Sequence, residues 1–185
     1  MRSRFNAESR FVDLVRHVRD FMDLVDLENH PLAEKYPVRL PVWWCRTGDS
    51  GPHPDVEGST GKTIVLRFEK TFGRIERIFA KLMRAPKELR RPLLDKNSVL
   101  WELCNGQRTF AEICKHMNAT FHEEVSPVVH RTHAGIQVFV GLNVMRVVNS
   151  PESIEWNTQP GIVPQGQDLP YEVSFDADVD VRDGD

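Results

Sequence analysis

The chain has 185 residues, a formal net charge of −3 and a hydrophobic fraction of 40%. A chain of this length forms one domain with extensions or two small domains, and its composition supports a hydrophobic core. No apolar run reaches the roughly 20 residues of a membrane-spanning helix, and residues 1–10 lack the apolar segment of a signal peptide. The three cysteines lie in apolar stretches, which predicts buried free thiols in a reducing, cytoplasmic setting; they are Cys45, Cys104 and Cys114.

The charge is unevenly distributed along the chain. Residues 149–185 hold nine acidic residues and one basic residue, so this segment carries −8 and residues 1–148 carry +5. Its polar character and its prolines and glycines predict a disordered acidic tail. A mildly basic body with such a tail suits a negatively charged partner, or a tail that shields the body.

Residues 1–35 are expected to form an amphipathic helix that ends at His30-Pro31. Apolar side chains recur at three- and four-residue steps along one face, namely Phe11, Leu14, Val15, Val18, Phe21, Met22 and Val25. Two interpretations remain open. The helix packs on its own domain, or it is offered to a partner or to a second copy, as in a homodimer.

Residues 36–87 read as an extension of strand, loop and helix. The β-prone run Tyr36–Arg46 is interrupted by Pro37 and Pro41, which predicts a short or edge strand. Residues 47–61 are rich in Gly, Pro, Asp and Ser and are expected to form an exposed loop. A strand follows at 64–69, and then an amphipathic helix over 72–86.

The stretch EGSTGKT, Glu57–Thr63, resembles part of a phosphate-binding loop. Such a loop needs a glycine where this chain has Val56, and it needs a helix to follow, whose N-terminus helps to hold the anion. The following residues alternate like a strand instead. Nucleotide binding is therefore not expected.

Residues 88–148 carry the clearest signals for local structure. A strand over 88–94 is expected at a sheet edge, because Pro92 lacks a backbone donor. Asp95 or Asn97 is expected to cap a first helix, and Asn105-Gly106 supplies a left-handed turn at its end. The inward residues of this helix are predicted to be Val99, Leu100, Leu103 and Cys104.

A second helix begins at a capping box formed by Thr109 and Glu112. Its buried residues are predicted to be Phe110, Ile113, Cys114 and Met117. Ser126-Pro127 opens a third helix, Asn143 ends it, and residues 144–148 return as a strand. The inner face of the third helix is predicted to hold Val129, His133, Ile136, Phe139 and Val140. This order predicts an α+β fold, a winged helix–turn–helix with a small antiparallel sheet.

The run RRPLLDKNSVLWELCNGQRTFAEICKHMNATF, with a third helix and NVMRVV after it, resembles the PqqD family of pyrroloquinoline quinone biosynthesis. The matching features are Leu94-Asp95, then Trp101-Glu102-Leu103, then Asn105-Gly106 and Thr109–Ile113. The wider group comprises the recognition elements for ribosomally made, post-translationally modified peptides. The resemblance implies a PqqD-like domain over 88–148, between the extension and the acidic tail of 149–185.

The resemblance also implies a peptide chaperone and not a catalyst. Family members capture the leader of a precursor peptide as an added strand, beside a wall formed by the third helix, and deliver it to a radical SAM or other peptide-modifying enzyme. The expected strand is lined by Arg90, Arg91, Leu93 and Leu94, and the expected helix wall by Arg131, Ala134, Gly135 and Val138. Gly135 would admit a peptide backbone, or it would pack against the N-terminal helix.

The main alternative is a winged-helix DNA-binding regulator. Such a protein needs basic and amide side chains along its recognition helix, and the third helix offers Arg131 and Gln137 with His130. This low charge argues against nucleic acid. His130 and His133 lie one turn apart, but a zinc site needs three or four ligands. No metal, cofactor or catalytic residue is expected.

Overall fold

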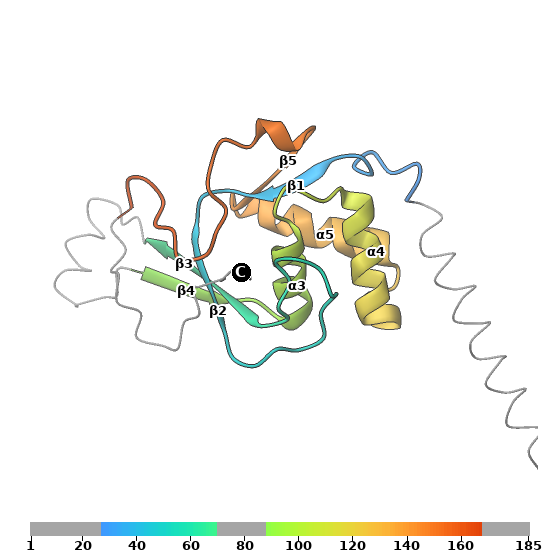
Figure 1. Ribbon diagram of the computed structural model, residues 1–185, viewed down its shortest axis with the longest axis horizontal. Helices are drawn as coiled ribbons and strands as arrows, with labels where there is room; N and C mark the ends of the chain where they lie inside the picture. Colours follow the sequence, from blue (N-terminus) through green and yellow to red (C-terminus); the bar gives the residue numbers. More distant parts are fainter. Residues whose placement is uncertain (1–26, 70–87, 168–185) are drawn as a thin grey trace, which may run out of the picture.

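The structure is a computed structural model that describes residues 27–69 and 88–167 (Figure 1). In these ranges the chain is an α+β protein with three α-helices and two small antiparallel sheets. The helices are α3 (Asp95–Leu103), α4 (Phe110–Phe121) and α5 (Val128–Gly141), with 3₁₀ turns η1 (His122–Val125) and η2 (Pro151–Ser153). The strands are β1 (Tyr36–Arg39), β2 (Trp43–Thr47), β3 (Thr63–Glu69), β4 (Glu88–Pro92) and β5 (Met145–Val148).

The two sheets use strands from distant parts of the sequence. β1 pairs with β5, with Tyr36 opposite Val148, and β3 lies between β2 and β4 in the other sheet. The predicted strand after Gly61 is confirmed. The β-prone run Tyr36–Arg46 forms two strands in different sheets, and the strand predicted over 88–94 ends at Pro92. Within the described residues β4 is an edge strand, as Pro92 predicts.

Helix α3 lies between the three-stranded sheet and the other two helices (Figure 1). Its Trp101 is fully buried and meets the Trp44 ring of β2 and the Phe139 ring of α5 edge-on, at centroid distances of 6.2 and 5.4 Å. These distances suit favourable edge-to-face aromatic pairs. Trp101 therefore joins the sheet and α5 in one hydrophobic core, and its predicted structural role is confirmed.

The helix ends follow local sequence signals in part. Thr109 and Glu112 form the predicted capping box at the start of α4, and Gly106 takes a left-handed conformation with φ of +85°. The predicted cap of α3 was wrong. Leu94 occupies the N-cap without a side-chain hydrogen bond, and Asp95 lies in the first turn.

Helix α5 starts directly after Pro127, and Asn143 has a positive φ just beyond its end, as predicted. Val129, Ile136 and Phe139 are buried, which agrees with the predicted inner face. Val140 was misassigned, because its side chain is 36% exposed while Val128 and Thr132 are buried instead. The inward face is rotated toward Val128 because α5 packs on α4 as well as on α3.

Residues 149–167 depart from the expected disorder. The indole N–H of Trp156 donates to the Arg39 carbonyl at 2.7 Å, and the Gly161 N–H donates to the Trp44 carbonyl at 2.8 Å. Trp44 in turn donates its indole N–H to the Thr158 carbonyl. This part of the predicted tail satisfies backbone groups of β1 and β2, so it belongs to the folded body.

Several expectations lie outside the described residues. These are the N-terminal helix with its possible second copy, the helix over 72–86 and the tail from 168 onward. The three cysteines are described, and all are buried and free, as predicted. Across 27–69 and 88–167, no helix is long and apolar enough to cross a membrane.

Candidate functional site

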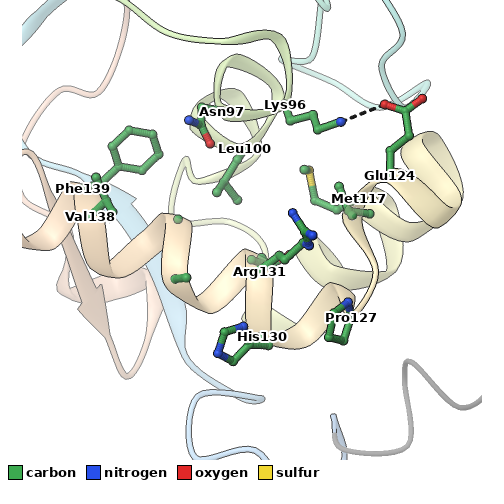
Figure 2. A pocket seen from close by; sticks show the side chains of 14 residues that line it. Lys96, Asn97, Leu100, Met117, Glu124, Pro127, His130, Arg131, Val138 and Phe139 are labelled. Carbon is green, nitrogen blue, oxygen red and sulfur yellow. Dashed lines mark ion pairs between the residues drawn. The ribbon is translucent and has the colours of Figure 1, made fainter.

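A groove of about 580 Å³ opens between α3, η1 and α5 (Figure 2). Leu100 of α3, Met117 of α4 and Phe139 of α5 are buried side chains that form its apolar floor. The α5 wall carries the four predicted residues of the third helix, Arg131, Ala134, Gly135 and Val138. We call this hollow the α3–α5 groove.

Gly135 of α5 lies where α5 packs closely against α3 along this groove. A Cβ atom built at Gly135 would lie 2.6 Å from Cδ2 of Leu100, so even a methyl group would push that side chain aside. Glycine inside a helix costs roughly 1 kcal/mol relative to alanine. The close packing of α3 against α5 explains why a glycine stands at this helical position. The missing side chain also leaves this side of the groove open.

An ion pair crosses one end of the α3–α5 groove. Nζ of Lys96, in the first turn of α3, lies 2.8 Å from Oε2 of Glu124 in η1 (Figure 2). The hydrogen bond and charge of Lys96 lower the pKa of the Glu124 carboxyl. Both side chains are well exposed, so this pair contributes little to folding stability. It instead places one cation and one anion at the rim, near the exposed Arg131.

The four predicted strand residues do not line this groove. Leu93 is half-buried against the core, and its N–H donates to the Ile64 carbonyl of β3. Arg90 and Arg91 are exposed on β4. Leu94 is 79% exposed and lies in a neighbouring hollow of about 410 Å³. That hollow shares Lys96, Asn97 and Glu124 with the α3–α5 groove.

Sequence reasoning missed the wall opposite α5. Among the residues that it did not propose as a binding surface are Lys96, Asn97, Leu100, Met117 and Glu124 on that side of the groove. Leu100 and Met117 were predicted to face inward, and that signal was correct. Periodicity along one helix shows which side chains face the core, but it does not show which buried residues border an opening between two helices.

His133 does not pair with His130 as a ligand set. His30 stacks on Phe110 with ring centroids 4.6 Å apart and meets the His133 ring edge-on at 4.9 Å. Nδ1 of His30 accepts a hydrogen bond from the Leu32 N–H. This cluster holds the segment that enters β1 against α4 and α5. Over the described ranges, no group of three His, Cys, Asp or Glu side chains could hold a metal ion.

The EGSTGKT stretch does bind an anion, but an internal one. The backbone N–H groups of Thr60 and Gly61 donate to Oε2 of Glu102 at 2.8 and 3.2 Å. Oε1 of Glu102 accepts from the Thr60 hydroxyl and from Nε of Arg46, each at 2.7 Å. The loop was predicted to be exposed, yet its last residues are only half-exposed because they cover this buried carboxylate.

The buried thiols are unsuited to nucleophilic chemistry. Burial raises the pKa of Cys104 and of Cys114 to about 12, so both stay protonated near neutral pH. No protein-family model, no curated protein and no solved structure matches the chain.

Proposed function

We propose that this protein is a non-catalytic peptide-binding protein of the PqqD type. It captures the leader of a ribosomal precursor peptide and presents it to a modifying enzyme, such as a radical SAM enzyme. The observation that carries the proposal is the α3–α5 groove, whose α5 wall contains Arg131, Ala134, Gly135 and Val138. The resemblance of 90–148 to the PqqD family supplies the class of ligand.

The chemistry of the groove suits one face of a peptide. Its volume lies within the range of about 300–1,000 Å³ found for ligand pockets. Val138 is 60% exposed at the edge of an apolar floor, so an aliphatic side chain placed there would cover it. Arg131 supplies an exposed cation at the rim for acidic leader residues, beside the Lys96–Glu124 ion pair, and this fits the positive charge of residues 1–148.

The edge strand β4 gives partial support for strand addition. Because the Leu93 N–H bonds to Ile64 and bonded pairs alternate in antiparallel ladders, the backbone of Pro92 faces away from β3. This explains why the proline does not disrupt the sheet, but it leaves a carbonyl without an N–H at that position. A peptide strand added here would donate an N–H to the Pro92 carbonyl, but the peptide carbonyl opposite Pro92 would need a donor from elsewhere.

The order of the folded elements agrees with a winged-helix body for the proposed function. Helices α3, α4 and α5 follow β4, and β5 returns to pair with β1. Three free, buried cysteines are consistent with a reducing compartment such as the cytoplasm. We therefore propose a cytoplasmic peptide chaperone that has no catalytic group of its own.

A peptide selection on a matched pair of variants tests the groove. A displayed library of random 12-residue peptides is selected on the wild-type protein and on the variants Val138→Arg and Val140→Arg. Both valines are exposed on α5, but Val138 lines the α3–α5 groove and Val140 lines a different hollow beyond the helix. We expect selected peptides to bind Val138→Arg at least about tenfold more weakly, a loss of about 1.4 kcal/mol, and to bind Val140→Arg like the wild type.

The binding surface is then mapped by NMR with the best selected peptide. Amide shifts concentrated at 96–100 and 131–138 would support the groove, and added shifts at 90–94 would support strand addition. A library that yields no binder, or equal loss in the two valine variants, would contradict the proposal. Shifts on α5 with a random DNA duplex and none with peptide would favour the DNA-binding alternative.

A further inference from the structure

Two arginine side chains from separate strands contact one buried indole ring, and a third arginine lies close to them. The guanidinium carbons of Arg39 in β1 and Arg46 in β2 lie 4.6 and 4.8 Å from the ring centroid of Trp44. Arg108, in the turn between α3 and α4, donates to the Glu57 carbonyl, which is next in the chain to the Gly58 carbonyl that accepts from Arg46. We call Arg39, Arg46 and Arg108 the arginine cluster.

The negative charge beside this cluster does not balance it. Within the described residues the one carboxylate in ion-pair contact is Glu102, which bonds to Nε of Arg46 at 2.7 Å. Its oxygens also accept from Thr60 and Gly61, so its bonding capacity is used. Cys104 adds no charge, because burial raises its thiol pKa to about 12. Three guanidinium cations thus share one carboxylate.

Several guanidinium nitrogens in the cluster have no acceptor in the described structure. They are Nε and Nη1 of Arg39, Nη1 of Arg46 and Nη1 of Arg108. Arg39 is only 5% exposed, and burial, reinforced by Arg46 and Arg108, lowers its pKa to about 10. The Trp44 ring face attracts these cations, but it accepts no in-plane N–H bond. Buried charges of this kind are normally paired, since an unpaired one costs several kcal/mol.

We infer that the arginine cluster binds a small oxyanion of the phosphate, sulfate or carboxylate class. Planar guanidinium groups match the oxygens of such anions, and the buried nitrogens of Arg39, Arg46 and Arg108 that lack an acceptor are the donors for them. The carbonyls of Gly58 and Glu57 accept from Arg46 and Arg108, so residues 57–61 cover the cluster. The site is separate from the α3–α5 groove and does not depend on the peptide function.

The test is thermal unfolding of the full chain in sodium phosphate against sodium chloride, at equal ionic strength and pH. Phosphate also stabilises proteins generally by exclusion from their surfaces, so variants decide the outcome. Arg39→Met and Arg108→Met remove cluster donors, and Arg146→Met removes an exposed arginine of β5 as the matched control. Sulfate and acetate replace phosphate in parallel samples to distinguish the classes of anion.

We expect a saturable rise of a few degrees in the wild-type midpoint at low millimolar phosphate. The rise should be unchanged in Arg146→Met, reduced in Arg108→Met and lost in Arg39→Met. Arg108 is only half-buried, so its variant keeps the test decisive if Arg39→Met does not fold. A wild-type response that never saturates, no response at all, or an equal response in Arg108→Met and Arg146→Met would overturn the inference.

Discussion

Replacing Glu102 with glutamine tests whether the buried ion pair beneath residues 57–61 is required for folding. The side chain is 1% exposed and its two oxygens accept from Arg46, from the Thr60 hydroxyl and N–H, and from the Gly61 N–H. Glutamine has nearly the same shape, but it keeps one acceptor oxygen and turns an NH₂ toward groups that are themselves donors. Arg46, only 3% exposed, then loses its counter-ion.

The size of the effect follows from this burial. Removing one partner of a buried ion pair costs about 3–5 kcal/mol, because the other charge stays buried without compensation. For a chain of this size, that corresponds to a fall in the unfolding midpoint of about 6–20 °C. The exposed pair of Lys96 with Glu124 is the matched control, and Glu124→Gln should leave the unfolding midpoint nearly unchanged.

Urea unfolding followed by tryptophan fluorescence measures both variants, because Trp43, Trp44 and Trp101 are buried. A double variant with Arg46→Met and Glu102→Leu removes both charges, and it should lose less stability than the two single changes added together. The reasoning is refuted if Glu102→Gln unfolds within about 1 kcal/mol of the wild type while the slope with urea stays the same.

Three further changes test other parts of the fold. Trp101→Ala should lower the free energy of unfolding by about 3–5 kcal/mol in the same urea assay. A loss smaller than about 1 kcal/mol would contradict a role for Trp101 in the core. Gly106→Ala should destabilise by about 1–3 kcal/mol more than Gly48→Ala, since both have positive φ but only Gly106 abuts other side chains; equal urea midpoints would contradict this. Burial lowers the pKa of His30 from 6.5, and the nearby His133 adds to this effect. As the pH falls, His30 is therefore protonated in the unfolded chain before it is protonated in the folded protein. Stability should therefore fall as pH drops below about 6.5, and His30→Gln should lose part of that dependence; an unchanged pH profile in this variant would refute the assignment.

Interactions between near neighbours in the chain could be predicted from the sequence. The capping box joins Thr109 to Glu112 across three residues, and Gly106 takes the left-handed turn that ends α3. Strand β4 lies at an edge, as its proline predicts. The face of α5 that holds Arg131, Ala134, Gly135 and Val138 was also identified, because the period of a helix places these residues together. In each case the determining contacts lie within about one helical turn, or depend on one residue's backbone chemistry.

Contacts between distant segments were decided only by the tertiary structure. Glu102 meets Thr60 across 42 positions in the chain, and Trp156 meets Arg39 across 117. The first contact turned a loop that resembles a phosphate-binding loop into a cover for an internal carboxylate, and the second made part of the acidic tail belong to the body. The side of the groove opposite α5 depends likewise on how α3 and η1 pack. No local pattern encodes such pairings, because any buried donor can be satisfied by an acceptor from any segment that the fold brings near.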